Sequence, residues 1–161
     1  MSDTLEMGIR KAEHLARNCD FGAALKVTDE LVRDHAEDAR AWSTRAYIHE
    51  LAEDHAAARS DLDRAIEMQS PDPALLFTRA RMSYLLAELD AALADVNEAI
   101  RLTSEAGGGS APQEMYCWRA AALIGLNRLA EARHDLGKVD DGFCIWTNGL
   151  VTKADLLAHC E

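Results

Sequence analysis

The sequence has little proline and glycine, with three prolines and nine glycines in 161 residues. Both residue types interrupt helices, and here they are clustered rather than spread along the chain. No stretch approaches 18 consecutive apolar residues, so no membrane-spanning helix and no membrane partner are expected. Only residues 143–146 have the composition of a β-strand, and a packed loop fits them equally well. The sequence therefore predicts a chain made almost entirely of helices.

Cysteine is also sparse, and its spacing excludes common metal sites. Cys19, Cys117, Cys144 and Cys160 form no CxxC pair and have no zinc-finger spacing to a histidine pair. The first residues lack the basic segment and apolar run of a secretory signal. These features favour a reducing, cytoplasmic setting, in which an unpaired cysteine packs as a small apolar residue.

Clusters of basic residues are missing as well. The net charge is −11, from 28 acidic and 17 basic residues, and the acidic excess is spread along the chain. A nucleic-acid partner is not expected, because phosphate binding needs clustered lysine and arginine. The acidic excess has two interpretations, a well-solvated surface or a docking face for a basic partner.

The motifs of the common catalytic and nucleotide-binding sites are absent. The sequence contains no GxGxxG, GxxxxGK[ST], HExxH or GxSxG. The histidines are scattered over polar helix faces, and no histidine spacing suggests an activated thiolate at Cys117. We therefore expect no catalytic residues, no metal and no cofactor, and a thiol- or metal-dependent enzyme remains the outside alternative.

What the chain does contain is an internal repeat with a period of 34 residues. Residues 41–46 (AWSTRA) align with residues 75–80 (LLFTRA), and the match continues downstream. A period of this size indicates stacked copies of one supersecondary unit. The matched pairs include Ala58 and Ala92, Asp61 and Asp95, Leu62 and Val96, Ala65 and Ala99, and Ile66 and Ile100.

Each repeat is predicted to contain two helices. Apolar residues recur at helical spacing, which places helices at about 39–52 and 55–68 in the second repeat. Asp54 is expected to cap the second of these helices. In the third repeat, Asp72 offers an N-cap and Pro73 occupies the first helical position, where its missing amide is tolerated. Small residues recur where two helices must approach closely, as at Ala46 and Ala58.

The fourth copy of the pattern is displaced, because Arg119 and Ala120 follow Arg79 and Ala80 by 40 residues instead of 34. The glycine-rich stretch 105–112 supplies the extra residues and is expected to be an exposed, flexible loop. Beyond about residue 140 the pattern fades. Leu150 through Cys160 is predicted to form a last amphipathic helix, with Thr147-Asn148-Gly149 as its start signal. That helix either caps the array or binds a partner.

These repeats resemble the tetratricopeptide repeat. Trp42, Ala46, Ala58, Leu62 and Ala65 occupy the W, G, A, F and A positions of its pattern, and equivalent residues recur in the third and fourth repeats. Arg45 and Arg79 depart from the pattern, which usually has leucine there. The resemblance implies an all-α fold, a right-handed α-solenoid (superhelix) of stacked antiparallel helix pairs. Other helical-pair repeats of similar length remain an alternative.

The expected organisation is one domain over residues 1–161. It would contain repeats at about 5–38, 39–72, 73–106 and 113–140, followed by a capping segment at 141–161.

The resemblance also implies a concave groove lined by the first helix of each repeat. Positions 2, 5, 9 and 12 of a repeat would face that groove. Aromatic residues with arginine have the composition of binding hot spots. The alternative is that these residues serve inter-repeat packing and ordinary surface solvation. The candidate groove residues are Arg40, Tyr47, Phe77, Arg81, Tyr84, Cys117 and Trp118.

The function expected from this resemblance is non-catalytic binding of a protein or peptide segment, with self-association left open. The alternative is a small acidic secretion-type chaperone that shields an exported client. Chaperone-binding members of the family use a clamp of lysine, asparagine and arginine side chains. The matching positions here supply neither a cation nor an amide, so that clamp is not expected; they are Ile9, Glu13, Thr44, Ala74 and Thr78.

Overall fold

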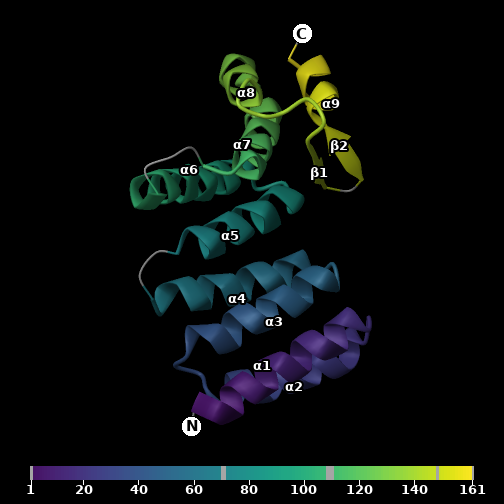
Figure 1. The fold of residues 1–161 in the computed structure, drawn as a ribbon, viewed down its shortest axis with the longest axis vertical. Coiled ribbons are helices and arrows are strands. Elements are labelled where there is room, and N and C mark those ends of the chain that lie inside the picture. The colour runs from purple at the N-terminus through teal and green to yellow at the C-terminus, as the bar shows by residue number, and fades with distance from the viewer. Residues whose placement is uncertain (1, 70–71, 108–110, 148, 161) are drawn as a thin grey trace. The chain divides into compact units, whose positions relative to one another are not determined.

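The computed structural model describes residues 2–69, 72–107, 111–147 and 149–160 (Figure 1). The chain divides into two compact halves, Met1–Leu75 and Leu76–Glu161, and each is described by itself. The predicted loop at 105–112 falls partly on Gly108-Gly109-Ser110, which lie outside the described residues. Its first residues are helical, since the preceding helix continues to Gly107.

The N-terminal half contains two helix pairs. Helix α1 (Ser2–Arg17) packs against α2 (Phe21–Asp34), and α3 (Ala39–Leu51) packs against α4 (His55–Glu67). Helix α3 also contacts α1 and α2, so the second pair stacks on the first. The predicted helices at 39–52 and 55–68 are therefore confirmed to within one residue at each end.

The C-terminal half contains the rest of α5 (Pro73–Leu85), followed by α6 (Leu89–Gly107), α7 (Gln113–Gly125) and α8 (Leu129–Leu136). Helix α7 contacts both α6 and α8. In the described parts of both halves, helices thus form the stacked antiparallel pairs that the sequence predicts.

Aspartate side chains cap the N-termini of several of these helices. Asp54 accepts a hydrogen bond from the amide of Ala57 at 3.1 Å, and Asp72 accepts one from the amide of Ala74 at 2.8 Å. Each aspartate satisfies an amide that has no partner within the helix, which stabilises a helix start by about 1 kcal/mol. Helix α5 begins at Pro73, directly after Asp72. Both predicted caps are confirmed.

The turns inside the four repeats share one geometry. Each contains a residue with a positive φ near 60°, in the left-handed region. The next residue donates its amide hydrogen to a carbonyl five residues earlier, as in Asp20 to Leu15 and Asp54 to His49. This pattern is the Schellman motif, which usually places glycine at the left-handed position. Here that position holds Cys19, Glu53, Ala87 and Asn127.

The cores are built on the small residues that the sequence singles out. Ala46, Ala58 and Ala65 are almost fully buried in the second repeat, and Ala80, Ala92 and Ala99 in the third. Because alanine has only one methyl group, the two helices of a pair can approach closely at these points. Larger side chains such as Ile48 and Leu62 fill the space on either side.

The tail differs from its prediction. Strand β1 (Cys144–Trp146) pairs antiparallel with β2 (Leu150–Thr152), with Ile145 opposite Val151. Helix α9 (Lys153–Ala158) follows and is shorter than the helix predicted from Leu150. The predicted start signal at 147–149 is wrong, since Thr152 caps the helix and forms a capping box with Asp155. Helix α9 contacts α7 and α8, and β1 contacts α7.

Candidate functional site

The predicted groove residues fall in both halves of the chain. Arg40 and Tyr47 lie on α3, in the N-terminal half. Phe77, Arg81 and Tyr84 lie on α5, and Cys117 and Trp118 lie on α7, all in the C-terminal half.

On α3, Tyr47 presents an exposed aromatic ring, with 45% of its surface accessible. Arg40 is also exposed, but it is already paired with Asp38. Its Nε and Nη2 atoms donate to the two carboxylate oxygens at 3.0 and 2.7 Å. Hydrogen bonding to Asp38 raises the pKa of Arg40 and lowers the pKa of Asp38. Of these two side chains, Tyr47 is the one better placed to meet a partner.

On α5 and α7, three predicted residues form one cluster. The rings of Tyr84 and Trp118 meet edge to face, with centroids 5.3 Å apart. The Arg81 guanidinium lies 5.5 Å from the centroid of the Trp118 ring, within range of a cation–π interaction. Burial raises the pKa of Tyr84, so its hydroxyl is neutral at ordinary pH. The structure thus brings together side chains that the sequence places on two different helices.

The remaining groove candidates lie deeper than predicted. Trp118 is only 4% exposed, and Phe77 is buried as well. Cys117 has no exposed surface, so in this conformation it does not line a groove. Trp118 therefore supports Arg81 and Tyr84 from beneath instead of reaching outward. Besides Arg40, which is exposed but paired with Asp38, the candidates with accessible surface are Tyr47, Arg81 and Tyr84.

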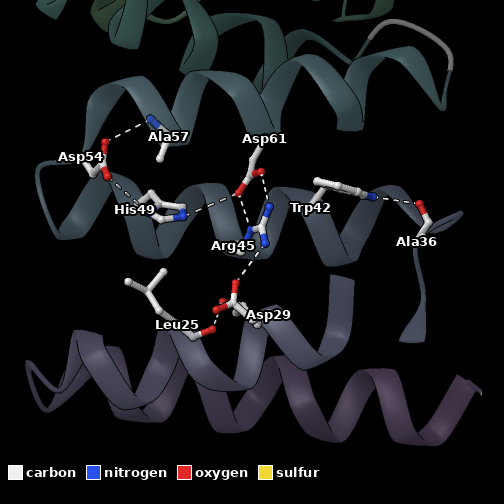
Figure 2. A network of polar contacts seen from close by, with 10 residues as sticks. Leu25, Asp29, Ala36, Trp42, Arg45, His49, Asp54, Ala57 and Asp61 are labelled. Carbon is white, nitrogen blue, oxygen red and sulfur yellow. Dashed lines mark hydrogen bonds and ion pairs between the residues drawn. The ribbon is translucent and has the colours of Figure 1, made fainter. Parts of the chain in front are cut away.

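The most regular polar feature is a set of arginine–aspartate pairs inside the repeats. In the second repeat, Arg45 donates from Nε and Nη2 to both carboxylate oxygens of Asp61, at 2.8 and 2.7 Å (Figure 2). The same two-bond geometry joins Arg79 to Asp95 and Arg119 to Asp135. In each case the two residues are 16 positions apart and lie on the two helices of one pair.

Two of these arginines, Arg45 and Arg119, also bond to the helix that precedes their own pair. Arg45 donates from Nη1 to Asp29 of α2 at 2.9 Å, and Figure 2 shows its guanidinium between Asp29 and Asp61. Arg119 donates in the same way to Asn97 of α6 at 3.0 Å. The paired carboxylates raise the pKa of Arg45 and of Arg119 above the ordinary value. Each of these two arginines thus ties together three helices.

The pairs explain the departure of Arg45 and Arg79 from the tetratricopeptide pattern. Both arginines hold aspartates that are themselves largely buried. The sequence signal was available, because arginine at 45, 79 and 119 and aspartate at 61, 95 and 135 recur with one constant offset. Each arginine alone resembles an isolated substitution, and its aspartate partner becomes apparent only when the repeats are aligned.

A pocket of about 310 Å³ opens beside the Arg119–Asp135 pair, between α6, α7 and α8. Apart from His134, its polar lining residues are already engaged, since Arg119 bonds Asp135 and Asn97, and Arg128 bonds Glu131. An anionic ligand would have to displace one of these partners. The pocket is therefore better understood as part of the packing between neighbouring repeats.

The described residues contain no group of three His, Cys, Asp or Glu side chains that could hold a metal ion. The same part of the chain includes no helix with the length and apolarity needed to cross a membrane. Cys19, Cys117 and Cys160 are free thiols, and Cys19 is the exposed one among them.

No protein-family model matches the chain, and no curated protein sequence matches it either. Several solved structures do match the chain. MamA from Desulfovibrio magneticus RS-1 superposes with a TM-score of 0.73 at 15% identity, over 84% of this chain and 73% of that one. The TPR protein YrrB superposes with a TM-score of 0.69 at 17% identity, over 81% of this chain and 64% of that one. The TPR2B domain of yeast Sti1 gives 0.67 at 23% identity, over 74% and 95%.

The chain has the tetratricopeptide-repeat fold. The agreement with several repeat structures confirms the fold class that the 34-residue period predicts. At these identities the likeness concerns the fold alone.

Proposed function

We propose that this tetratricopeptide-repeat chain is a non-catalytic interaction module that binds a protein or peptide segment along the first helices of its repeats. The observation that carries the proposal is the Arg81–Trp118–Tyr84 cluster, in which a cation and two aromatic rings from neighbouring helices are held in contact. Packing on Trp118 restricts Arg81 and Tyr84 before a partner arrives, which reduces the entropy lost on binding. Tyr47 presents a comparable ring from α3.

Two structural neighbours that bind peptides support this proposal. YrrB is described as having an unusual peptide-binding site, and the Sti1 TPR2B domain was solved in complex with pHsp70. The present chain would not bind its partner through the lysine and asparagine clamp of the chaperone-binding family members, and would use different contacts. Thr44, one of the matching positions, is buried, and its hydroxyl donates to the Arg40 carbonyl at 2.7 Å.

The proposal also includes a cytoplasmic setting and the absence of bound cofactors. The three described thiols that are unpaired suit a reducing compartment. An acidic chain of net charge −11 favours partners with basic segments over acidic ones.

The test is an affinity capture from the native host, with partners identified by mass spectrometry. The wild-type chain should retain a defined partner that the double variant Arg81→Ala, Tyr84→Ala loses. Arg101→Ala is a matched control, because Arg101 is exposed on α6 and, among the described residues, pairs within its own helix with Glu98 and Glu105. A partner retained equally by all three proteins would contradict the proposed binding surface, provided that circular dichroism shows each variant to be folded.

A further inference from the structure

The C-terminal half contains a second, larger pocket of about 470 Å³. It is bounded by the C-terminal ends of α5 and α7, by the turn before α6 and by the tail. Its apolar lining includes Leu85, Leu89, Ile124, Val151 and Leu156. This volume falls within the range of sites that hold small ligands or single large side chains.

The tail wall of this pocket is held in place by several independent contacts. Val151 pairs with Ile145 across the hairpin, and Ile145 is buried. Lys153 donates to the Val139 carbonyl at 2.7 Å and to the Asp141 carboxylate at 2.8 Å. The wall is therefore formed before any ligand arrives, so binding would not have to order it.

The pocket meets the predicted binding surface at Tyr84. Tyr84 lines the pocket and also contacts Trp118 in the cation–aromatic cluster. Ile124 occupies the last predicted groove position of α7. An extended segment lying across Arg81 and Tyr84 could thus place its next side chain in this pocket.

The charged residues adjacent in sequence to the pocket's described lining residues have one sign. None of its described lining residues is Asp, Glu, Lys or Arg. The charged residues next in sequence to a described lining residue are all acidic and exposed, namely Glu88, Asp90 and Asp155. An apolar cavity with an acidic border complements an apolar group that has a positive charge beside it.

We propose that this pocket receives one aliphatic or aromatic side chain of a partner peptide, with a lysine or arginine adjacent to that side chain. The proposal rests on the interaction function above and adds to it the chemical class of the bound segment.

The first experiment measures fluorescence anisotropy with three labelled synthetic peptides of equal length. One has a central phenylalanine flanked by lysines, one has serine in place of the phenylalanine, and one has glutamates in place of the lysines. The first peptide should bind about tenfold more tightly than either of the others, and added salt should weaken it. Failure of the first peptide to bind, or equal binding of all three, would overturn the proposal.

The second experiment locates the binding with two variants of the pocket and one control. Val151→Glu places a carboxylate in the tail wall, and Ile124→Trp fills the pocket from α7 without changing the hairpin. Leu150→Glu is the control, because Leu150 is the exposed neighbour of Val151 on the same strand. Both pocket variants should weaken the first peptide at least tenfold, while the control should bind as the wild type does.

Unchanged binding by Ile124→Trp would remove the pocket as the site, even if Val151→Glu disturbed the tail. The interaction function is judged separately, by the capture from the native host. A natural partner that binds the wild type and both pocket variants equally would leave the interaction function standing and overturn the pocket assignment alone.

Discussion

The first two helix pairs have the same backbone plan but different polar contacts. Their turns place Cys19 and Glu53 in the same left-handed conformation, with φ of 60° and 61°. Their close contacts use Ala12 and Ala24 in one pair, and Ala46 and Ala58 in the other, and all four are buried.

The difference lies in the ion pair. Where the second pair has Arg45 bound to Asp61, the first has Lys11 and Val27, which can form no such pair. Where the second has Trp42, the first has Gly8, and the Leu31 side chain occupies the space that a Cβ would need. A helix pair of this kind thus forms without the ion pair, and the arginine–aspartate pair adds a link between three helices.

The largest expected effect comes from breaking that link. Asp61→Ala leaves the Arg45 guanidinium, which is only 21% exposed, with Asp29 as its remaining carboxylate partner. The free energy of unfolding should fall by about 3 kcal/mol, as is usual when one partner of a buried pair is removed. Chemical denaturation monitored by circular dichroism would measure it. Lys11→Ala in the first pair is the control and should change the free energy by less than about 0.5 kcal/mol. Equal losses in both variants would contradict the comparison.

Replacing both partners should be far milder than removing one. The double variant Arg45→Leu, Asp61→Leu gives the second repeat the apolar residue that the family pattern has at position 45. Its free energy of unfolding should lie within about 1 kcal/mol of the wild type, because no unpaired charge is left buried. The same denaturation series would show it. A double variant as unstable as Asp61→Ala would mean that the pair is needed for more than its charge balance.

Because the two helix pairs share one turn geometry, glycine at the left-handed position should raise the free energy of unfolding equally in both. Cys19→Gly and Glu53→Gly should each stabilise the chain by about 1 kcal/mol, since glycine avoids the strain of the left-handed conformation. Ala94→Gly, at an exposed position within α6, should instead destabilise it by about 1 kcal/mol. Thermal unfolding of the three variants would compare them. If glycine stabilised the chain at only one of the two turns, the two left-handed residues would differ in backbone strain despite their similar φ angles.

The smallest expected effect concerns pH in the second pair. Hydrogen bonds from Arg40 lower the pKa of Asp38, which caps α3, below its ordinary value of 3.8. A carboxylate with a lowered pKa in the folded state stabilises the protein above its ordinary pKa, and that contribution is lost as pH falls through the folded value. Asp38→Asn keeps a capping oxygen but should lose less stability than the wild type between pH 5 and about pH 3. Equal acid sensitivity of the two proteins in thermal unfolding would contradict this role.

Much of the fold could be predicted from the sequence because its determinants are local and repeated. The alanines at constant offsets, the aspartates before α4 and α5, and the helix boundaries of the second repeat all follow from neighbouring residues. The tail could not be predicted in the same way. Three-residue strands depend on pairing across the hairpin and on packing of β1 against α7, and no periodic sequence pattern indicates either contact.

The candidate site was predictable in part. Helical spacing selected Arg81 and Tyr84, but it could not reveal that Cys117 has no exposed surface or that Trp118 lies beneath Arg81. Burial depends on which helix covers which face, and that is a tertiary property. The arginine–aspartate pairs, in contrast, could be predicted from the sequence, because the two residues recur at a constant offset of 16 positions.

The most direct test of the account is titration calorimetry of a captured natural partner against the wild type and the Arg81→Ala, Tyr84→Ala variant. We expect the dissociation constant to rise at least tenfold, which corresponds to a loss of about 1.4 kcal/mol, with the helical spectrum unchanged. An unchanged dissociation constant for the folded variant would contradict the claim that the chain recognises its partner through the first helices of its repeats.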